Sequence, residues 1–105
     1  MRIVLDACVP QPFRHALPGH IVHTARHLGL SRLDDGTLLR SLAGQYDVLV
    51  TCDRNIPWQN QITGLRLAVV ILRARTNKLS DLLPLAPQLI RALPFLSPGY
   101  VRQIA

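Results

Sequence analysis

Short runs of β-branched and aliphatic residues alternate along the chain with segments of helical spacing. Two runs, 48–51 and 67–72, are apolar at nearly every position. This pattern is typical of strands buried on both faces of a parallel sheet. A shorter run at 3–5 and a β-branched run at 20–24 predict two further strands, and residues 100–104 could add a short edge strand.

The best defined helix follows Asp34. Aspartate is a preferred N-cap residue, the apolar positions between 37 and 43 have helical spacing, and Gly44 is a usual helix stop. Two shorter helical segments, at 10–17 and 25–30, precede it, and each is ended by a glycine. Strands separated by helices predict one α/β domain with a parallel sheet covered on both faces.

Residues 79–93 follow the last buried run and carry apolar side chains at helical spacing. They predict a long amphipathic helix that Pro84 and Pro87 kink or divide, because proline lacks an amide hydrogen and clashes with the preceding turn. Its apolar face could supply the contact of a homodimer.

The chain is long enough for a single core and has no segment suited to a membrane. It has 105 residues, and polar residues interrupt every apolar stretch well before the roughly 20 residues that a span needs. Asp6 precedes any possible secretory apolar segment, so no signal peptide is expected. We therefore expect a soluble cytoplasmic protein, in which Cys8 and Cys52 are free thiols with a structural role.

The charge balance favours a polyanionic partner. Twelve Lys and Arg residues against six acids give a net charge of +6, which is typical of nucleic-acid binders but also fits solubility or an acidic protein partner. Aromatic residues make up only 5% of the chain, which argues against a surface that stacks successive bases. Contact with phosphates is the expected binding mode.

Three aspartates coincide with the predicted strand ends. Asp6 follows the first run, Asp53 follows the third, and Asp35 lies in the first turn of the helix between the second and third. Because ligands of open α/β sheets bind outside the carboxyl ends of the strands, we expect these carboxylates to converge. Converging carboxylates repel one another unless a hard cation such as Mg²⁺ or Mn²⁺ lies between them, and such a site activates water for attack on phosphate.

Each aspartate also has a purely structural interpretation. Asp34 and Asp35 could be a helix cap and a first-turn acid, and Asp6 and Asp53 could be turn residues whose side chains bond their own backbone. For any one of them the structural interpretation is the better one. The three together favour a site.

Several basic residues are candidates for nucleic-acid binding. Arg73 and Arg75 follow the fourth run and share a face if that strand continues. Guanidinium groups suit bidentate contact with phosphate. Asn77 and Lys78 extend the patch. The segment from Arg54 to Gln61, which contains Trp58, could close over a strand of RNA, or Trp58 could anchor this loop to the core.

The four histidines do not predict a metal site. His23 and His27 are four residues apart, but His23 lies in a predicted strand, so the pair lacks the helical face that metal ligation at this spacing requires. Core or surface imidazoles are the better interpretation.

Five short motifs follow one another along the chain: Met1–Pro10, Leu17–His20, Gly29-Leu30 with Asp35 and Leu38-Leu39, Leu49–Asp53 and Val69–Arg75. In this order they resemble the motifs of the small stand-alone PIN-like proteins of bacteria. This superfamily consists of metal-dependent ribonucleases, many of them toxins of toxin–antitoxin pairs. The resemblance implies a Rossmann-like PIN fold with a mainly parallel sheet of four to five strands. It also implies a Mg²⁺-dependent endoribonuclease with catalytic Asp6, Asp35 and Asp53, and an antitoxin partner.

Two positions depart from the family pattern. Relatives usually carry an acid directly after the first-strand aspartate and often another two residues after the third-strand one, where this chain has Ala7 and Asn55. The Asn55 carbonyl oxygen could still serve as a metal ligand beside the three aspartates. The alternative is a catalytically degenerate module that binds RNA or a protein partner without cleaving.

Overall fold

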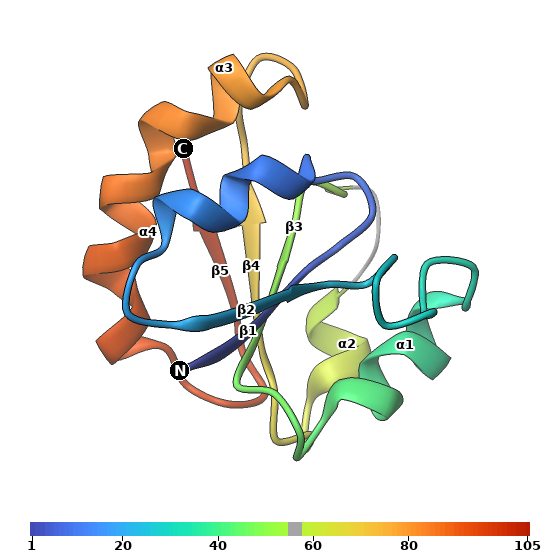
Figure 1. The fold of residues 1–105 in the computed structure, drawn as a ribbon. Helices are drawn as coiled ribbons and strands as arrows, with labels where there is room; N and C mark the ends of the chain where they lie inside the picture. Colours follow the sequence, from blue (N-terminus) through green and yellow to red (C-terminus); the bar gives the residue numbers. More distant parts are fainter. Residues whose placement is uncertain (55–57) are drawn as a thin grey trace.

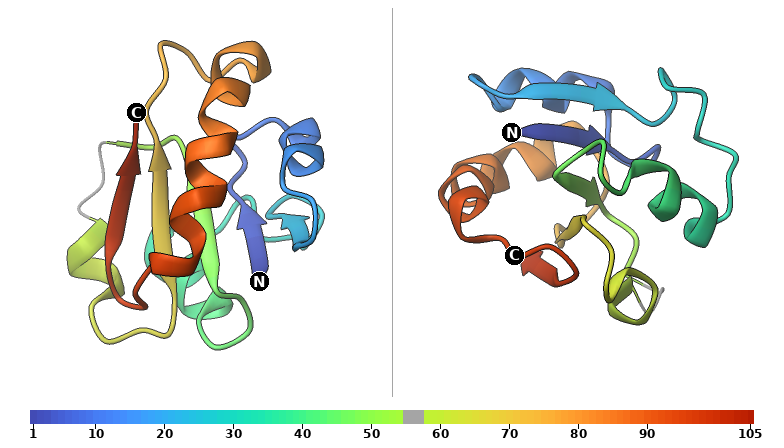
Figure 2. Two further views of the ribbon diagram at one scale, coloured as in Figure 1. Left: turned by 90° about the vertical axis from the view of Figure 1, so that its left-hand side faces the viewer. Right: turned by 90° about the horizontal axis from the view of Figure 1, so that it is seen from below.

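Five parallel strands form a single sheet in the computed structural model, which describes residues 1–54 and 58–105. The strands lie in the order β2-β1-β3-β4-β5, and every neighbouring pair is parallel. Figure 2 shows them side by side and pointing the same way. The strands are β1 (Arg2–Leu5), β2 (Ile21–Thr24), β3 (Val48–Thr51), β4 (Ala68–Leu72) and β5 (Val101–Ile104).

Helices cover both faces of this sheet, with α3 and α4 on one side and α1 and α2 on the other (Figure 1). The predicted α/β fold of the Rossmann-like type is therefore confirmed. In chain order the helices are η1 (Gln11–Ala16), α1 (Asp35–Leu42), α2 (Trp58–Ile62), α3 (Leu79–Leu82), η2 (Leu83–Leu85), α4 (Ala86–Ala92) and η3 (Leu93–Phe95), where η marks a 3₁₀-helix.

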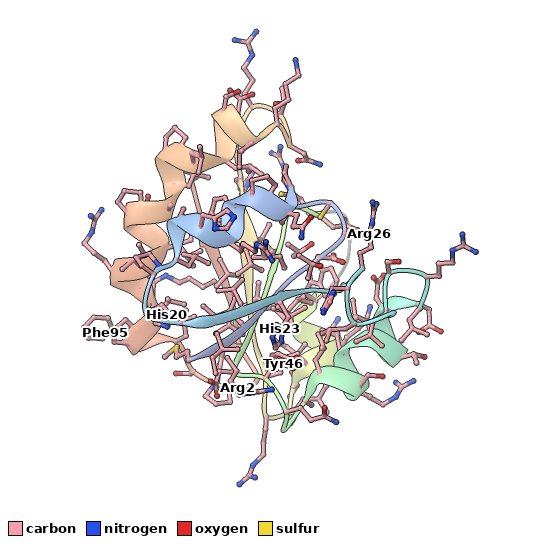
Figure 3. All side chains as sticks on the ribbon, viewed as in Figure 1. Arg2, His20, His23, Arg26, Tyr46 and Phe95 are labelled. Carbon is pink, nitrogen blue, oxygen red and sulfur yellow. The ribbon has the colours of Figure 1, made fainter. Side chains whose placement is uncertain are left out.

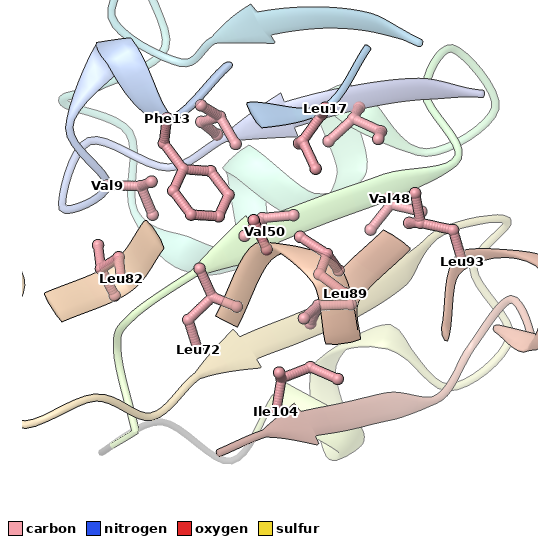
Figure 4. Packing of buried hydrophobic residues seen from close by; sticks show 14 of the residues in the cluster. Val9, Phe13, Leu17, Val48, Val50, Leu72, Leu82, Leu89, Leu93 and Ile104 are labelled. Atoms are coloured by element: carbon pink, nitrogen blue, oxygen red, sulfur yellow. The ribbon is translucent and has the colours of Figure 1, made fainter. Parts of the chain in front are cut away.

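The core is divided into two layers by the alternation of side chains along each strand. On β3, Val48 and Val50 face the layer formed with η1, α3 and α4, whereas Leu49 faces the layer formed with α1 and α2. Figure 4 shows Phe13 and Leu89 packed over the first of these faces. Because both faces of β3 are covered, all four of its residues are buried, as the run at 48–51 predicts.

The helix signals near α1 are confirmed. The Asp34 carboxylate accepts a hydrogen bond of 2.8 Å from the amide of Thr37, as an N-cap residue does. The segment 25–30 is one turn, in which the amide of Leu30 bonds to the carbonyl of Ala25 and Gly29 has a φ of 75°. This is the bonding pattern by which glycine ends a helical turn.

The predicted helix over 79–93 is divided, as its prolines predict. The chain passes from α3 through η2, which contains Pro84, into α4. The inward side chains of Leu82 and Leu89 are fully buried against the sheet. The apolar face considered for a dimer contact therefore lies in the core, while Leu83 and Ile90 remain 40% and 37% exposed. Within the described ranges, no helix is long and apolar enough to cross a membrane.

Candidate functional site

The candidate site lies at the carboxyl edge of the sheet between β1 and β3. The strand order reverses direction here, because the chain goes from β1 outward to β2 and then returns to β3 on the other side of β1. In doubly wound sheets such a reversal leaves a crevice outside the strand ends, and ligands bind in it. Asp6 follows β1 directly, and Asp53 lies two residues beyond the end of β3.

A buried threonine joins these two aspartates. The Thr51 hydroxyl donates a hydrogen bond of 2.8 Å to Oδ2 of Asp6 and accepts one of 3.1 Å from the amide of Asp53. The other Asp6 oxygen, Oδ1, accepts a bond of 2.8 Å from the amide of Ala7. Both oxygens of Asp6 are thus oriented by the protein. The role of Thr51 in the site could not be predicted from the sequence, because a β-branched residue at this position is already explained by the strand.

Asp35 is electrostatically coupled to the same site. It begins α1, which starts after β2 has ended at this edge. Burial raises the pKa of Asp35, and the negative charges of Asp53, Asp6 and Asp34 raise it further. The charges of Asp53 and Asp6 therefore add to burial in disfavouring the ionised form of Asp35.

The acids do not form a closed metal cage. Within residues 1–54 and 58–105, no three His, Cys, Asp or Glu side chains are grouped closely enough to hold a metal ion directly. Mg²⁺ usually keeps several waters and binds through one or two carboxylates, so the oriented Asp6 and its acidic neighbours fit a cation that stays largely hydrated. Asn55, the fourth candidate ligand, lies outside the described residues.

Trp58 anchors the segment after β3 to the core. Its side chain is 1% exposed, and its indole Nε1 donates a hydrogen bond of 2.8 Å to the carbonyl of Asp53. The interpretation that Trp58 closes over RNA is therefore wrong, because a buried ring cannot stack on a base. Its role is to fix the backbone beside a site residue.

Two hollows flank the aspartates. One, of about 340 Å³, contains Asp6 and is bordered by Arg26 and His27 in the turn after β2. Arg26 is exposed and lies on the periphery of the molecule (Figure 3). Sequence analysis missed both residues; the only available signal was their position just after a strand that ends at the carboxyl edge.

The second hollow, of about 620 Å³, is lined by residues of the β1, β3 and β4 ends. Arg54 borders it, and its guanidinium Nη2 donates to the carbonyl of Ala74 at 3.1 Å, which ties the end of β3 to that of β4. Arg54 is therefore a basic residue at the acidic edge. The lining residues are Cys8, Cys52, Asp53, Arg54 and Asn77.

The other basic candidates lie apart from this hollow. β4 ends at Leu72, so strand alternation no longer sets the directions of Arg73 and Arg75. The Arg73 guanidinium donates to the side chain of Gln103 on the edge strand β5 at 2.9 Å. Arg75 is exposed, and Lys78 is the exposed N-cap residue of α3.

Two free thiols border the Thr51 network. The Cys8 sulfur accepts a hydrogen bond of 3.2 Å from the amide of Cys52 and lies 3.4 Å from the Thr51 hydroxyl. The hydrogen bond from the Cys52 thiol is the main reason why the pKa of Cys8 is lowered to about 6, although burial opposes it. The same bond, together with burial, raises the pKa of Cys52.

A separate polar cluster contains His23, Tyr46 and Arg2. His23 Nδ1 and the Tyr46 hydroxyl are 2.7 Å apart, and the Arg2 guanidinium lies 4.9 Å from the centre of the Tyr46 ring. Figure 3 shows these three side chains together. A hollow of about 480 Å³ between Arg2 and Arg66 opens nearby, but none of the three aspartates lines it.

No family model, curated protein or solved structure matches this chain. Its function therefore has to be inferred from the residues of the site.

Proposed function

We propose that the protein is a Mg²⁺-dependent endoribonuclease whose site is the carboxyl edge between β1 and β3. The observation that carries this proposal is that Thr51 links Asp6 and the main chain of Asp53 at the strand-order reversal of a chain with a net charge of +6. Acids that repel one another in a basic protein suit a cation bound together with a polyanion.

The aspartates would hold the cation, with Mn²⁺ as a possible substitute for Mg²⁺. When bound, the cation supplies Lewis-acid polarisation of a phosphoryl oxygen and a water of lowered pKa. Thr51 holds the Asp6 carboxylate in one orientation, and Trp58 fixes the backbone of Asp53. These two contacts limit the reorganisation that the site would need on binding.

The flanking arginines would bind the RNA backbone. Arg26 borders the hollow that contains Asp6, and Arg54 borders the hollow that contains Asp53. Guanidinium groups on both sides of the acids can bind successive phosphates and place the phosphodiester between them beside the acids. Arg73, Arg75 and Lys78 would extend this contact toward β5 and α3.

The cellular role proposed here is that of the toxin of a toxin–antitoxin pair, acting in the cytoplasm. Its support is the resemblance to small PIN-like proteins together with the basic charge, which would complement an acidic antitoxin. Dimer formation is not part of this proposal, because the inward face of α4 is buried in the core.

A second candidate is a degenerate module that binds RNA or a protein without cleaving it. Two observations favour it: Ala7 stands where the family usually carries an acid, and in the described part of the chain no three ligating side chains are grouped. Fewer anionic ligands mean weaker cation binding, although RNA phosphates could supply the remaining oxygens.

An RNA cleavage assay separates the two candidates. We expect the purified chain to cleave single-stranded RNA with Mg²⁺ or Mn²⁺, and Asp6→Asn to abolish cleavage even at saturating metal. Asp47→Asn is the matched control, because Asp47 is an exposed acid at the other end of β3 that accepts a bond from the Arg2 amide. If saturating Mn²⁺ gives no cleavage that depends on Asp6, the chain is the binding module.

A further inference from the structure

Cys8 and Cys52 are brought together from positions 44 residues apart. Cys8 lies in the loop after β1 and Cys52 directly after β3, so the pairing of these strands places them at the same edge. The Cys8 sulfur lies 3.2 Å from the Cys52 amide nitrogen, from which it accepts a hydrogen bond. Both cysteines line the hollow of about 620 Å³, so they face a space open to small molecules.

We propose that Cys8 and Cys52 form a reversible intramolecular disulfide when the protein meets a peroxide. Sequence analysis assigns these cysteines a structural role only. Their mutual contact and their place on a hollow instead indicate a redox-active pair. In a reducing compartment, such disulfides are usually transient and serve redox sensing or catalysis.

The reaction has two steps. The Cys8 sulfur attacks one peroxide oxygen and the O–O bond breaks. The departing hydroxide takes up the thiol proton and leaves as water, and Cys8 becomes a sulfenic acid. The Cys52 sulfur then attacks the Cys8 sulfur, the S–O bond breaks and a second water leaves. Two thiols are oxidised by two electrons and hydrogen peroxide is reduced to two waters; a dithiol reductant reverses the change by exchange.

The order of the two cysteines follows from their exposure. Cys8 is partly exposed, whereas Cys52 is 7% exposed, so the oxidant reaches Cys8 first. Cys52 then acts as the resolving thiol from the adjacent strand. Because the Cys8 sulfur already lies 3.2 Å from the main-chain nitrogen of Cys52, we expect the disulfide to form mainly by rotation of the two side chains.

The disulfide would also disturb the aspartate site. The Cys8 sulfur now lies 3.4 Å from the Thr51 hydroxyl and 3.9 Å from Oδ2 of Asp6, and bonding to Cys52 would draw it out of these contacts. Loss of ribonuclease activity on oxidation would follow. This consequence rests on the proposed function, but formation of the disulfide does not.

Mass spectrometry tests the pair directly in the full chain. After treatment with hydrogen peroxide and alkylation of the remaining thiols, we expect the wild type to carry no alkyl group and to be lighter by two hydrogen atoms. Digestion with trypsin should release peptides 3–14 and 41–54 as one disulfide-linked species, because they contain Cys8 and Cys52. Dithiothreitol should restore both alkylation sites.

Two serine variants assign the roles. Cys52→Ser should accumulate a sulfenic acid at position 8 that dimedone traps, and Cys8→Ser should leave the Cys52 thiol alkylatable. The linked wild-type peptides decide the question even if a variant fails to fold. Two alkylated thiols after peroxide, disulfides only between molecules, or overoxidation of Cys8 without a linked peptide would each overturn the proposal.

Discussion

The Thr51 hydroxyl donates a hydrogen bond of 2.8 Å to the Asp6 carboxylate, across the gap between β3 and β1. The same oxygen accepts the Asp53 amide at 3.1 Å. One buried side chain thus connects the two strand ends that carry the acids of the proposed metal site. This contact explains why the end of β3 bears a hydroxyl amid otherwise apolar residues.

Thr51→Val should therefore reduce both stability and cleavage. Valine has nearly the same shape but leaves the Asp6 carboxylate and the Asp53 amide without this partner, which costs about 1–3 kcal/mol for a buried polar contact. Denaturation by urea measures the loss. Thr51→Ser, which keeps the hydroxyl, is the control and should retain cleavage. A valine variant as stable and active as the wild type would remove Thr51 from the site.

Asp35→Asn should stabilise the protein at neutral pH. Because the pKa of Asp35 is raised by burial and by the charges of Asp53 and Asp6, the folded state holds this proton more tightly than the unfolded state does. Ionised Asp35 therefore lowers the free energy of unfolding. This loss disappears as the pH falls through the raised pKa of the folded state toward the ordinary pKa of the unfolded state. We expect a gain of a few tenths of a kcal/mol at pH 7, since part of the repulsion is screened by solvent.

Measurements at acidic pH and the variant Asp34→Asn are the controls for this prediction. The gain from Asp35→Asn should vanish at acidic pH, where the wild-type side chain is neutral too. Asp34→Asn should show no such gain, because hydrogen bonds from Thr37 lower the pKa of Asp34 and its ionised form is the stabilising one. Equal behaviour of the two variants in urea titrations across pH would contradict the repulsion between the three acids.

Trp58→Phe tests the anchor of Asp53. The variant loses the indole bond to the Asp53 carbonyl and part of the buried ring, so we expect a destabilisation of about 1–3 kcal/mol and weaker cleavage. Trp58→Ala should cost more, about 3–5 kcal/mol, because it leaves a large cavity. Thermal unfolding of both variants measures the order. Stability of the Phe variant equal to that of the wild type would show that the bond contributes nothing.

RNA binding should depend on the arginines beside the acids. Arg26→Ala and Arg54→Ala should each weaken binding across sequences and reduce the slope of log K against log salt by about 1, because each lost phosphate contact releases fewer counterions. The double variant Arg73→Ala, Arg75→Ala should also flatten the slope, but less, since these two residues do not line the hollow that contains Asp53. Arg66, which borders the hollow at the opposite end of the sheet, supplies the control Arg66→Ala. Fluorescence anisotropy at several salt concentrations measures the RNA affinity of each variant. The same affinity and salt slope for all variants, including Arg66→Ala, would contradict this prediction.

The sequence predicts the fold well where local signals agree. The almost wholly apolar runs of β3 and β4 predict strands buried on both faces, and Asp34 predicts the start of α1 through its cap. Side-chain directions beyond β4 are less predictable, because Arg73 to Arg75 continue the alternation while the strand has already ended.

Only part of the site can be predicted from the sequence. The positions of Asp6 and Asp53 follow from strand ends, but the bond from Thr51 to Asp6 joins residues 45 apart. For Trp58 the sequence leaves an RNA contact and a core anchor open, and the structure shows the buried anchor. Such contacts depend on how distant segments meet, which periodicity along the chain does not encode.

The most direct test of the central claim is the position of Mn²⁺ in crystals of the protein, located by its anomalous scattering. We expect a peak at the carboxyl edge between β1 and β3, at about 2 Å from an oxygen of Asp6 or Asp53, as inner-sphere binding of a small hard cation requires. Crystals of Asp6→Asn should lose this peak. Wild-type crystals at saturating Mn²⁺ with no peak at this edge would contradict the claim that these aspartates form a metal site.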